Sequence, residues 1–213
     1  MVMKFILASQ SPRRLELFSR LRLSFKQVPA EVDETVGDAP PPPEIFAENI
    51  ARSKAEAVAR LWKDHTVVGA DTVVVAGGRI LGKPGNEDRA WEMLSLLNGR
   101  RHRVVTGIAV VQGGHGITWT GVKVTEVEFH QVSEGDLRDY IRGGEPFDKA
   151  GGYGIQEKGR FLVKLVSGCY SNVVGLPLCL LVELLRKAGM DGSSWDEAAV
   201  RCCVLPYAKE SSK

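Results

Sequence analysis

The segment at residues 7–14 (LASQSPRR) combines side chains that suit phosphate binding. It places a Ser-Pro helix start at Ser11 and Pro12, with the guanidinium groups of Arg13 and Arg14, directly after an apolar stretch. Backbone N–H groups and the dipole at a helix start favour an anion, and arginine can bind phosphate through two parallel hydrogen bonds. An ordinary capped helix with two solvated arginines explains the same residues equally well, so this segment alone leaves both readings open.

Two carboxylates and a lysine stand further along the chain, each where a predicted strand or helix meets a loop. They are Glu34 in EVDET, Asp71 in VGADT and Lys83 in GKP. Carboxylates are the hard oxygen ligands that magnesium prefers, and a carboxylate can also orient or deprotonate an attacking water. Each residue taken alone is more often an exposed structural charge. Asp71 is the strongest candidate because it interrupts a run of valines, where an unpaired charge at the end of a buried strand would be costly.

The sequence lacks the signatures of several common enzyme classes. It contains no G-x-x-x-x-G-K-[ST] loop, no G-x-G-x-x-G after a strand and no H-E-x-x-H. Its histidines show no metal-ligand spacing, and we interpret them as surface or satisfied core residues: His65, His102, His115 and His130. A zinc site and a histidine-based nucleophilic triad are therefore not expected.

The composition predicts a cytoplasmic protein with one large domain or two small lobes. The chain has 213 residues, of which 44% are hydrophobic and 25% charged, and its formal charge of +2 suggests no broad nucleic-acid surface. The longest apolar run, residues 173–182, is well short of the roughly 20 residues that span a bilayer, and the N-terminus has no signal-peptide pattern. No C-x-x-C pair occurs, and we expect reduced thiols at Cys169, Cys179, Cys202 and Cys203, the last two as inert packing.

Hydrophobic periodicity predicts alternating strands and helices. The predicted strands are residues 4–8, 25–28, 66–76, 79–81, 103–111, 118–132 and 161–166. The predicted helices are residues 12–21, 44–62, 87–97, 134–141 and 178–188. Long strands joined by short glycine-rich turns are antiparallel, so we expect an α/β fold with a mixed sheet.

Seven motifs in order resemble the motif set of the Maf family of nucleotide pyrophosphatases. They are ASQSPRR, ARSKAEAVA, VVGADTVV, LGKP, LNGRRHRVVTG, DKAGGYGIQ and VVGLPL, and the match covers about residues 4 to 188. The resemblance implies a mixed, strongly twisted sheet flanked by helices, two lobes around a cleft, an architecture related to the inosine triphosphate pyrophosphatases, and a homodimer. It divides the chain into a Maf-like domain at residues 1–189 and a C-terminal extension at 190–213. In the extension, Trp195, Ala199 and Cys202 would line one side of a short helix.

The resemblance also implies roles for individual residues. Positions that hold the triphosphate in the family are matched by Ser9, Arg13, Arg14, Lys54 and Lys83. Glu34 and Asp71 match the acidic positions that serve the metal, Mg²⁺ or Mn²⁺, and the water, with Asp71 at the proposed proton acceptor and Lys83 beside them in catalysis. Three specificity positions carry Arg13, Thr72 and Gln156, as in the branch that acts on dTTP and UTP. The branch that acts on 7-methyl-GTP shows tryptophan, glutamine and glutamate there.

The predicted activity is therefore metal-dependent hydrolysis of a nucleoside triphosphate to the monophosphate and pyrophosphate, as house-cleaning of the nucleotide pool. No nucleic acid or membrane partner is expected. Two alternatives stay open: a nucleotide-binding regulator of cell division, and a pyrophosphatase of the 7-methyl-GTP type. A pure binding protein has no use for a base beside the metal, so the acidic pair Glu34 and Asp71 favours an enzyme over a regulator.

Overall fold

The computed structural model describes residues 4–37, 39–192, 195 and 207–208. Within them one sheet runs through the molecule in the order β2-β1-β3-β5-β6-β7-β8, with β4 paired to β3. Its strands are β1 (Phe5–Ala8), β2 (Phe25–Gln27), β3 (Thr66–Ala76), β4 (Arg79–Leu81), β5 (Arg101–Gln112), β6 (Ile117–Phe129), β7 (Val163–Ser167) and β8 (Tyr207–Ala208). β1 is parallel to β2 and to β3, and the other pairs are antiparallel. The predicted mixed sheet is confirmed.

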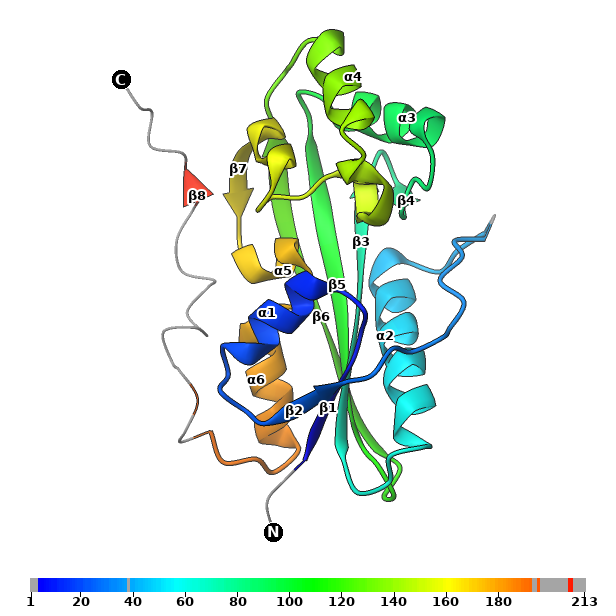
Figure 1. Cartoon of the computed structure of the whole chain (residues 1–213), viewed down its shortest axis with the longest axis vertical. Coiled ribbons are helices and arrows are strands. Elements are labelled where there is room, and N and C mark those ends of the chain that lie inside the picture. Colours follow the sequence, from blue (N-terminus) through cyan, green and yellow to red (C-terminus); the bar gives the residue numbers. More distant parts are fainter. Residues whose placement is uncertain (1–3, 38, 193–194, 196–206, 209–213) are drawn as a thin grey trace.

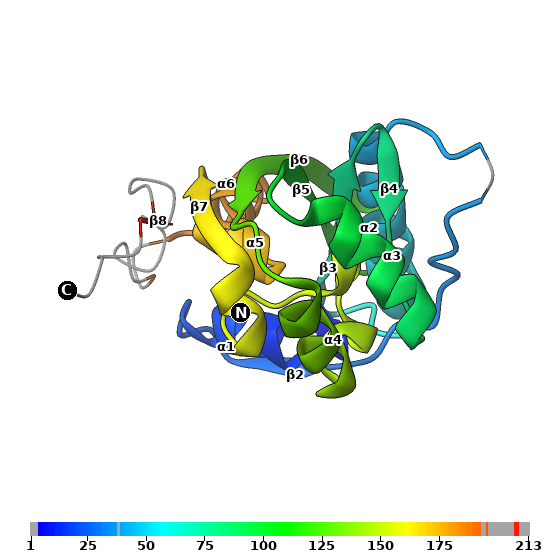
Figure 2. The same ribbon diagram turned by 90° about the horizontal axis from the view of Figure 1, so that it is seen from above.

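Helices cover both faces of this sheet (Figure 1). They are α1 (Pro12–Ser19), α2 (Pro43–Ala59), α3 (Glu87–Leu97), α4 (Glu134–Arg142), α5 (Tyr170–Val174) and α6 (Leu178–Lys187), with 3₁₀ turns η1 (Glu145–Asp148), η2 (Ala150–Gly152) and η3 (Lys158–Leu162). α2 packs on one face of β3 and β5, whereas α1, α3, α4 and α6 share a separate core on the other face. Seen from above, β3 and β5 lie between α2 on one side and α1, α5 and α6 on the other (Figure 2).

Alternation along β3 decides which face each side chain joins. Val68 and Ala70 lie in the core with α1 and α6, while Val67 packs with α2. Successive side chains of a strand point to opposite faces, so Asp71 and the next residue, Thr72, also leave the strand on opposite sides. A site that uses both Asp71 and Thr72 must therefore be open on both faces of the sheet at this part of β3.

Two glycines allow α2 to approach the sheet closely. A Cβ atom on Gly107 of β5 would lie 2.4 Å from the Ala47 carbonyl oxygen of α2, and a Cβ on Gly69 of β3 would lie 2.3 Å from the Ala51 carbonyl oxygen. Real Cβ atoms do not come so near, and a helix backbone cannot yield locally as a side chain can. The backbone of α2, the helix that carries Lys54, therefore packs directly against β3, the strand that carries Asp71.

Side-chain caps set the beginnings of several helices. Ser11 accepts a hydrogen bond from the Arg14 backbone N–H at the start of α1, where Pro12 occupies the first turn as predicted. Asn86 caps α3 in the same way, and Ser133 forms a capping box with Asp136 at α4. The start of α1 directly after β1 is thus encoded locally.

Two predicted strand boundaries are wrong. The strand expected at 161–166 begins at Val163, because residues 158–162 form η3, which closes the glycine-rich segment against Glu145 through the Gly159 N–H (3.0 Å). The strand expected to reach Val132 ends at Phe129, because the Asn98 side chain bonds both the N–H (3.0 Å) and the carbonyl (2.9 Å) of Val132.

The C-terminal extension is described only in part. Trp195 is buried and belongs to the same core cluster as α6. Ala199, Cys202 and Cys203 lie outside the described residues, and so does the short helix expected there. Among the described residues no helix is both long and apolar enough to cross a membrane.

We predict that Gly107→Ala destabilises the fold by about 1 to 3 kcal/mol, because the added methyl group forces α2 away from β5. Urea unfolding followed by circular dichroism measures this change. Gly37→Ala is the matched control, since nothing lies within 4 Å of a Cβ there. Equal stabilities for the two variants would show that α2 can shift at no cost.

Candidate active site

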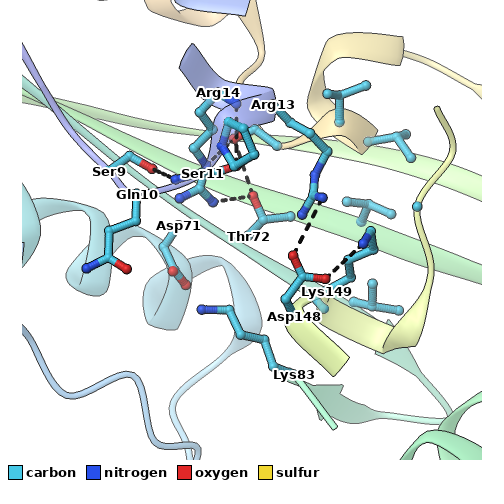
Figure 3. A pocket seen from close by; sticks show the side chains of 18 of the residues that line it. Ser9, Gln10, Ser11, Arg13, Arg14, Asp71, Thr72, Lys83, Asp148 and Lys149 are labelled. Atoms are coloured by element: carbon cyan, nitrogen blue, oxygen red, sulfur yellow. Dashed lines mark hydrogen bonds and ion pairs between the residues drawn. The ribbon is translucent and has the colours of Figure 1, made fainter. Parts of the chain in front are cut away.

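A cavity of about 390 Å³ opens where α1 begins, beside β3 and the segment 148–156. Every residue to which the sequence analysis gave a role lines it: Ser9, Arg13, Arg14, Glu34, Lys54, Asp71, Thr72, Lys83 and Gln156. These residues come from six separate stretches of the chain, and Figure 3 shows several of them around the opening. Only the tertiary fold places them together.

The turn between β1 and α1 forms one wall of the cavity. Ser9 is buried, its hydroxyl accepts a hydrogen bond from the Ser11 N–H (3.2 Å), and its carbonyl accepts one from the Gln27 side chain (2.9 Å). The Ser11 hydroxyl is already used as the cap of α1. The turn is therefore rigid, and it presents the positive end of the helix dipole to the cavity.

A buried ammonium group joins the two carboxylates. Lys54 Nζ lies 2.7 Å from Asp71 Oδ1 and 2.8 Å from Glu34 Oε1, and both Lys54 and Asp71 are only 5% exposed. Lys83 Nζ lies 3.2 Å from the other oxygen of Glu34. The carboxylates of Glu34 and Asp71 thus face one common point, with lysines on two sides.

These contacts set the protonation of Glu34. Burial acts to raise its pKa, but the hydrogen bond and charge of Lys54, together with Lys83, outweigh burial, so the pKa lies below its ordinary value. Glu34 is therefore ionised at neutral pH and able to act as an oxygen ligand.

Arg14 turns away from this acidic group and binds the protein itself. Its Nε donates to the Gly175 carbonyl (2.8 Å), one Nη donates to the Ala70 carbonyl (2.9 Å), and the other donates to Thr72 Oγ1 (3.0 Å). Burial lowers the pKa of its guanidinium group, although the charges of Asp71 and Glu34 act to raise it. Arg14 thus sits in the wall of the cavity.

Arg13 points toward the segment 145–157 and meets charges that the sequence analysis did not assign. Its Nη1 lies 3.1 Å from Glu157 Oε1 and 3.8 Å from Asp148 Oδ2. The buried ammonium group of Lys149 lies 2.8 Å from Asp148 Oδ1 and 3.5 Å from Glu157 Oε2. Two cations and two anions therefore alternate around one edge of the cavity. Asp148 and Lys149 stand in the motif DKAGGYGIQ, and their opposite charges beside a glycine run were the available signal.

The glycine-rich segment carries Gln156 to the cavity. Gly151 and Gly152 adopt positive φ values of 67° and 75°, and Gly151 lies against Val74 of β3. Tyr153 follows them, and its hydroxyl lies 2.8 Å from Nε2 of His102. Burial lowers the pKa of His102 to about 4, so it is neutral at physiological pH, as expected for a core histidine.

A second cavity of about 480 Å³ adjoins the first at Glu34, Asp71, Thr72 and Lys83. Its other walls are mainly apolar and come from the loop before α2, from α2 itself, from β3 and β4, and from α3: Val36, Phe46, Val73, Ile80 and Met93. The acidic pair therefore stands at the junction of two chambers. That arrangement suits a substrate with two chemically different ends.

The acidic pair fits a divalent metal that binds together with its substrate. The described residues contain no group of three or more histidine, cysteine, aspartate or glutamate side chains able to hold a metal ion by themselves. Magnesium commonly takes only one or two protein carboxylates and completes its shell with waters and phosphate oxygens. Glu34 and Asp71 bring two carboxylates close to one point, which the ammonium group of Lys54 occupies in this structure.

Comparisons with known proteins identify the family of this chain. Residues 4–188 match the family model described as Maf-like protein. The chain is 44% identical to the dTTP/UTP pyrophosphatase of Syntrophus aciditrophicus (91% of this chain, 94% of that protein) and 46% identical to the dTTP/UTP pyrophosphatase of Bacillus cereus ATCC 14579 (88% and 97%). Among solved structures, it is similar to the Staphylococcus aureus Ham1 protein, with 18% identity, a TM-score of 0.43, and coverage of 59% of this chain and 71% of that one.

We predict that Lys54→Met raises the pKa of Glu34, because the variant keeps the length of the side chain and loses the ammonium group. In the wild type the folded pKa lies below the unfolded value, so the contribution of Glu34 to stability is present above the unfolded pKa. That contribution is lost as pH falls through the folded pKa. This pH dependence becomes smaller in the variant.

Carboxyl ¹³C NMR titration measures the change directly. Glu92 is the internal control, because Arg79 and Arg89 lower its pKa on the surface of α3. An unchanged Glu34 midpoint in Lys54→Met would contradict the electrostatic role of Lys54.

Proposed function

Because this chain belongs to the Maf family, we propose that it is a metal-dependent nucleoside triphosphate pyrophosphatase that hydrolyses dTTP and UTP. The observation that carries the proposal is the convergence of Glu34 and Asp71 on Lys54 Nζ, inside a cavity rimmed by further cations. An anionic substrate needs the cations, and a hydrolytic reaction needs the carboxylates. The cavity offers both.

The cations of the cavity would hold the triphosphate. Ser9 and the N-terminal end of α1 contribute hydrogen-bond donors, while Arg13, Lys54 and Lys83 contribute positive charge from three sides. Arg13 and Lys83 would offset the negative charge that develops on the leaving pyrophosphate. Their present partners, Glu157 and Glu34, keep these side chains in place at the cavity before substrate arrives.

Water activation would rest on the two carboxylates. Asp71 would take the proton of a water that attacks the α-phosphorus, after which pyrophosphate would leave without a covalent intermediate. A divalent cation held by Glu34 and Asp71 would lower the pKa of that water and neutralise phosphate charge. Lys54 keeps the pKa of Glu34 low, which favours the ionised ligand.

Base recognition is proposed for Thr72 and Gln156, which reach the cavity from β3 and from the glycine-rich segment. Uracil and thymine present two carbonyl acceptors around one N–H donor, and the glutamine amide can pair with an adjacent acceptor and donor. A base that leaves such groups without partners loses about 1 to 3 kcal/mol for each one. The relatives named dTTP/UTP pyrophosphatase support this choice of substrates.

The acidic pair also argues against a protein that only binds nucleotides. The ion pair of Asp71 with Lys54 does no more than offset the hydration that both charges lose on burial, so it adds little stability. Carboxylates at the centre of a polyanion-binding site also weaken binding, because they repel the ligand. In an enzyme, the same carboxylates would serve in catalysis.

Product identification tests the proposal. Purified protein is incubated with Mg²⁺ or Mn²⁺ and, separately, dTTP, UTP, CTP, GTP and 7-methyl-GTP, and the products are resolved by anion-exchange chromatography. We expect nucleoside monophosphate and pyrophosphate, with the highest kcat/KM for dTTP and UTP. Release of orthophosphate from the γ position would place the reaction at the wrong bond, and a preference for 7-methyl-GTP would refute the substrate assignment.

We predict that Asp71→Asn lowers kcat by about 10² to 10⁴, the usual contribution of a positioned general base, while nucleotide still binds. The amide keeps the shape of the side chain and loses its basicity. Steady-state kinetics and calorimetric titration with α,β-methylene-UTP measure the two quantities. Asp64→Asn, on the exposed turn before β3, is the matched control and keeps wild-type kinetics. Full activity of Asp71→Asn would remove this residue from the mechanism.

A further inference from the structure

Arg14 makes contacts unlike those of the other cations at the cavity. Arg13, Lys54 and Lys83 each lie beside carboxylate oxygens, whereas the hydrogen bonds of Arg14 go to two backbone carbonyls and one hydroxyl. These acceptors belong to three different residues, Gly175, Ala70 and Thr72. The planar guanidinium group is suited to such a task because its donors point in fixed, diverging directions.

Two of the acceptors flank Asp71 in the chain. The Ala70 carbonyl belongs to the peptide group directly before Asp71, and Thr72 is the next residue after it. Arg14 therefore restrains β3 on both sides of the proposed base, from the face of the sheet opposite to Lys54. A shift of this short stretch would move the Asp71 carboxylate relative to Glu34 and to any bound phosphate.

The third acceptor ties the same group to the end of α5. Gly175 has a φ of 115°, and a Cβ atom there would lie 3.4 Å from Thr72 Oγ1 and 3.5 Å from Arg14 Nε. This glycine lets its carbonyl approach the guanidinium group closely. Arg14 thus joins α1, β3 and α5 at one point.

The network continues into the core. Thr72 Oγ1 lies 2.9 Å from Thr106 Oγ1 on β5, and the Thr106 hydroxyl donates to the Asn172 carbonyl of α5 (3.3 Å). Thr106 and Asn172 are both fully buried, and the Asn172 amide donates to the Val104 carbonyl (3.0 Å). The two hydroxyls and the amide NH₂ group of this network are hydrogen-bonded at low dielectric, which holds them firmly in one arrangement, whereas the side-chain oxygen of Asn172 has no hydrogen-bond partner among the described residues.

We propose that Arg14 is a positioning residue, which holds the Ala70–Thr72 stretch of β3 so that Asp71 is correctly placed, and that it is not a ligand of the triphosphate. The proposal rests on the pyrophosphatase function above and departs from the phosphate-binding role that the family resemblance implies for this arginine. A positioning role depends on the shape of the guanidinium group, because its donors must reach three separate acceptors. A phosphate-binding role would depend mainly on its positive charge.

Arg14→Lys separates the two roles, because lysine keeps the charge and can reach at most part of the three acceptors. We expect kcat for UTP to fall by about 10²-fold, as for a small misplacement of a catalytic group. The Kd for inorganic triphosphate, a probe without the base that Thr72 is proposed to contact, should stay within about threefold of wild type. Arg20→Lys is the matched control, since Arg20 lies at the exposed end of the same helix and pairs with Glu16.

A second variant leaves Arg14 intact. Thr106→Val removes the hydroxyl that supports Thr72 from the buried side and should lower kcat about tenfold, because the stretch that carries Asp71 is then less precisely placed. Thr106→Ser keeps that hydroxyl and should keep the wild-type kcat. A purely structural role would lower the melting temperature of Arg14→Lys and Thr106→Val without changing kcat of the folded protein.

An NMR readout makes the test independent of turnover. The Asp71 amide and Thr72 methyl resonances should shift in Arg14→Lys and stay in place in Arg20→Lys. If the wild type releases no pyrophosphate, the proposed function fails while these resonances still report on Arg14. Wild-type kcat in Arg14→Lys, unmoved resonances, or an affinity for inorganic triphosphate that is kept in Arg14→Lys and lost in Arg14→Gln would overturn the proposal.

Discussion

The ion pairs of Lys54 with Asp71 and Glu34 are the interaction on which the rest of the site depends. They join helix α2 to the central strand β3 and to the loop before α2. Both Lys54 and Asp71 are buried, and either charge left alone there would lose its hydration without compensation. Lys54 Nζ and Asp71 Oδ1 lie 2.7 Å apart, and Gly69 and Gly107 favour this contact because they let the backbone of α2 reach the sheet. The close packing at these glycines and the ion pairs of Lys54 therefore depend on each other.

The alternation of side chains along β3 gives the site two supports on opposite faces. Asp71 meets Lys54 on the side of α2, whereas Thr72 meets Arg14 on the side of α1 and α5. A single strand segment is therefore held between two cations from different layers of the fold. Such a stretch can be rigid although it lies beside an open cavity, and rigidity of this kind is what a positioned base requires.

The charges around Arg13 form a separate, more exposed group at the edge of the cavity. Asp148, Lys149 and Glu157 all belong to the segment 145–157, so this group connects α1 to the glycine-rich turns that carry Gln156. The proposed phosphate and base contacts are thereby linked through the protein. Because Glu157 is partly exposed, solvent and salt weaken its pair with Arg13 far more than the buried pair of Lys54.

Local sequence determined the elements and the identity of most candidate residues. The cap at Ser11, the valine run of β3, the glycine turn into β4 and the limits of α3 depend on neighbours in the chain, and each could be predicted. Asp71 stood out because a charge within an apolar run needs a partner. Tertiary structure alone decided which partner that was, since Lys54 lies 17 residues away on a helix whose depth is set by Gly107 of a third element. It also turned Arg14 toward backbone carbonyls, and it ended β6 early through Asn98. Distances between remote side chains follow from how the layers pack, and no local pattern carries that information.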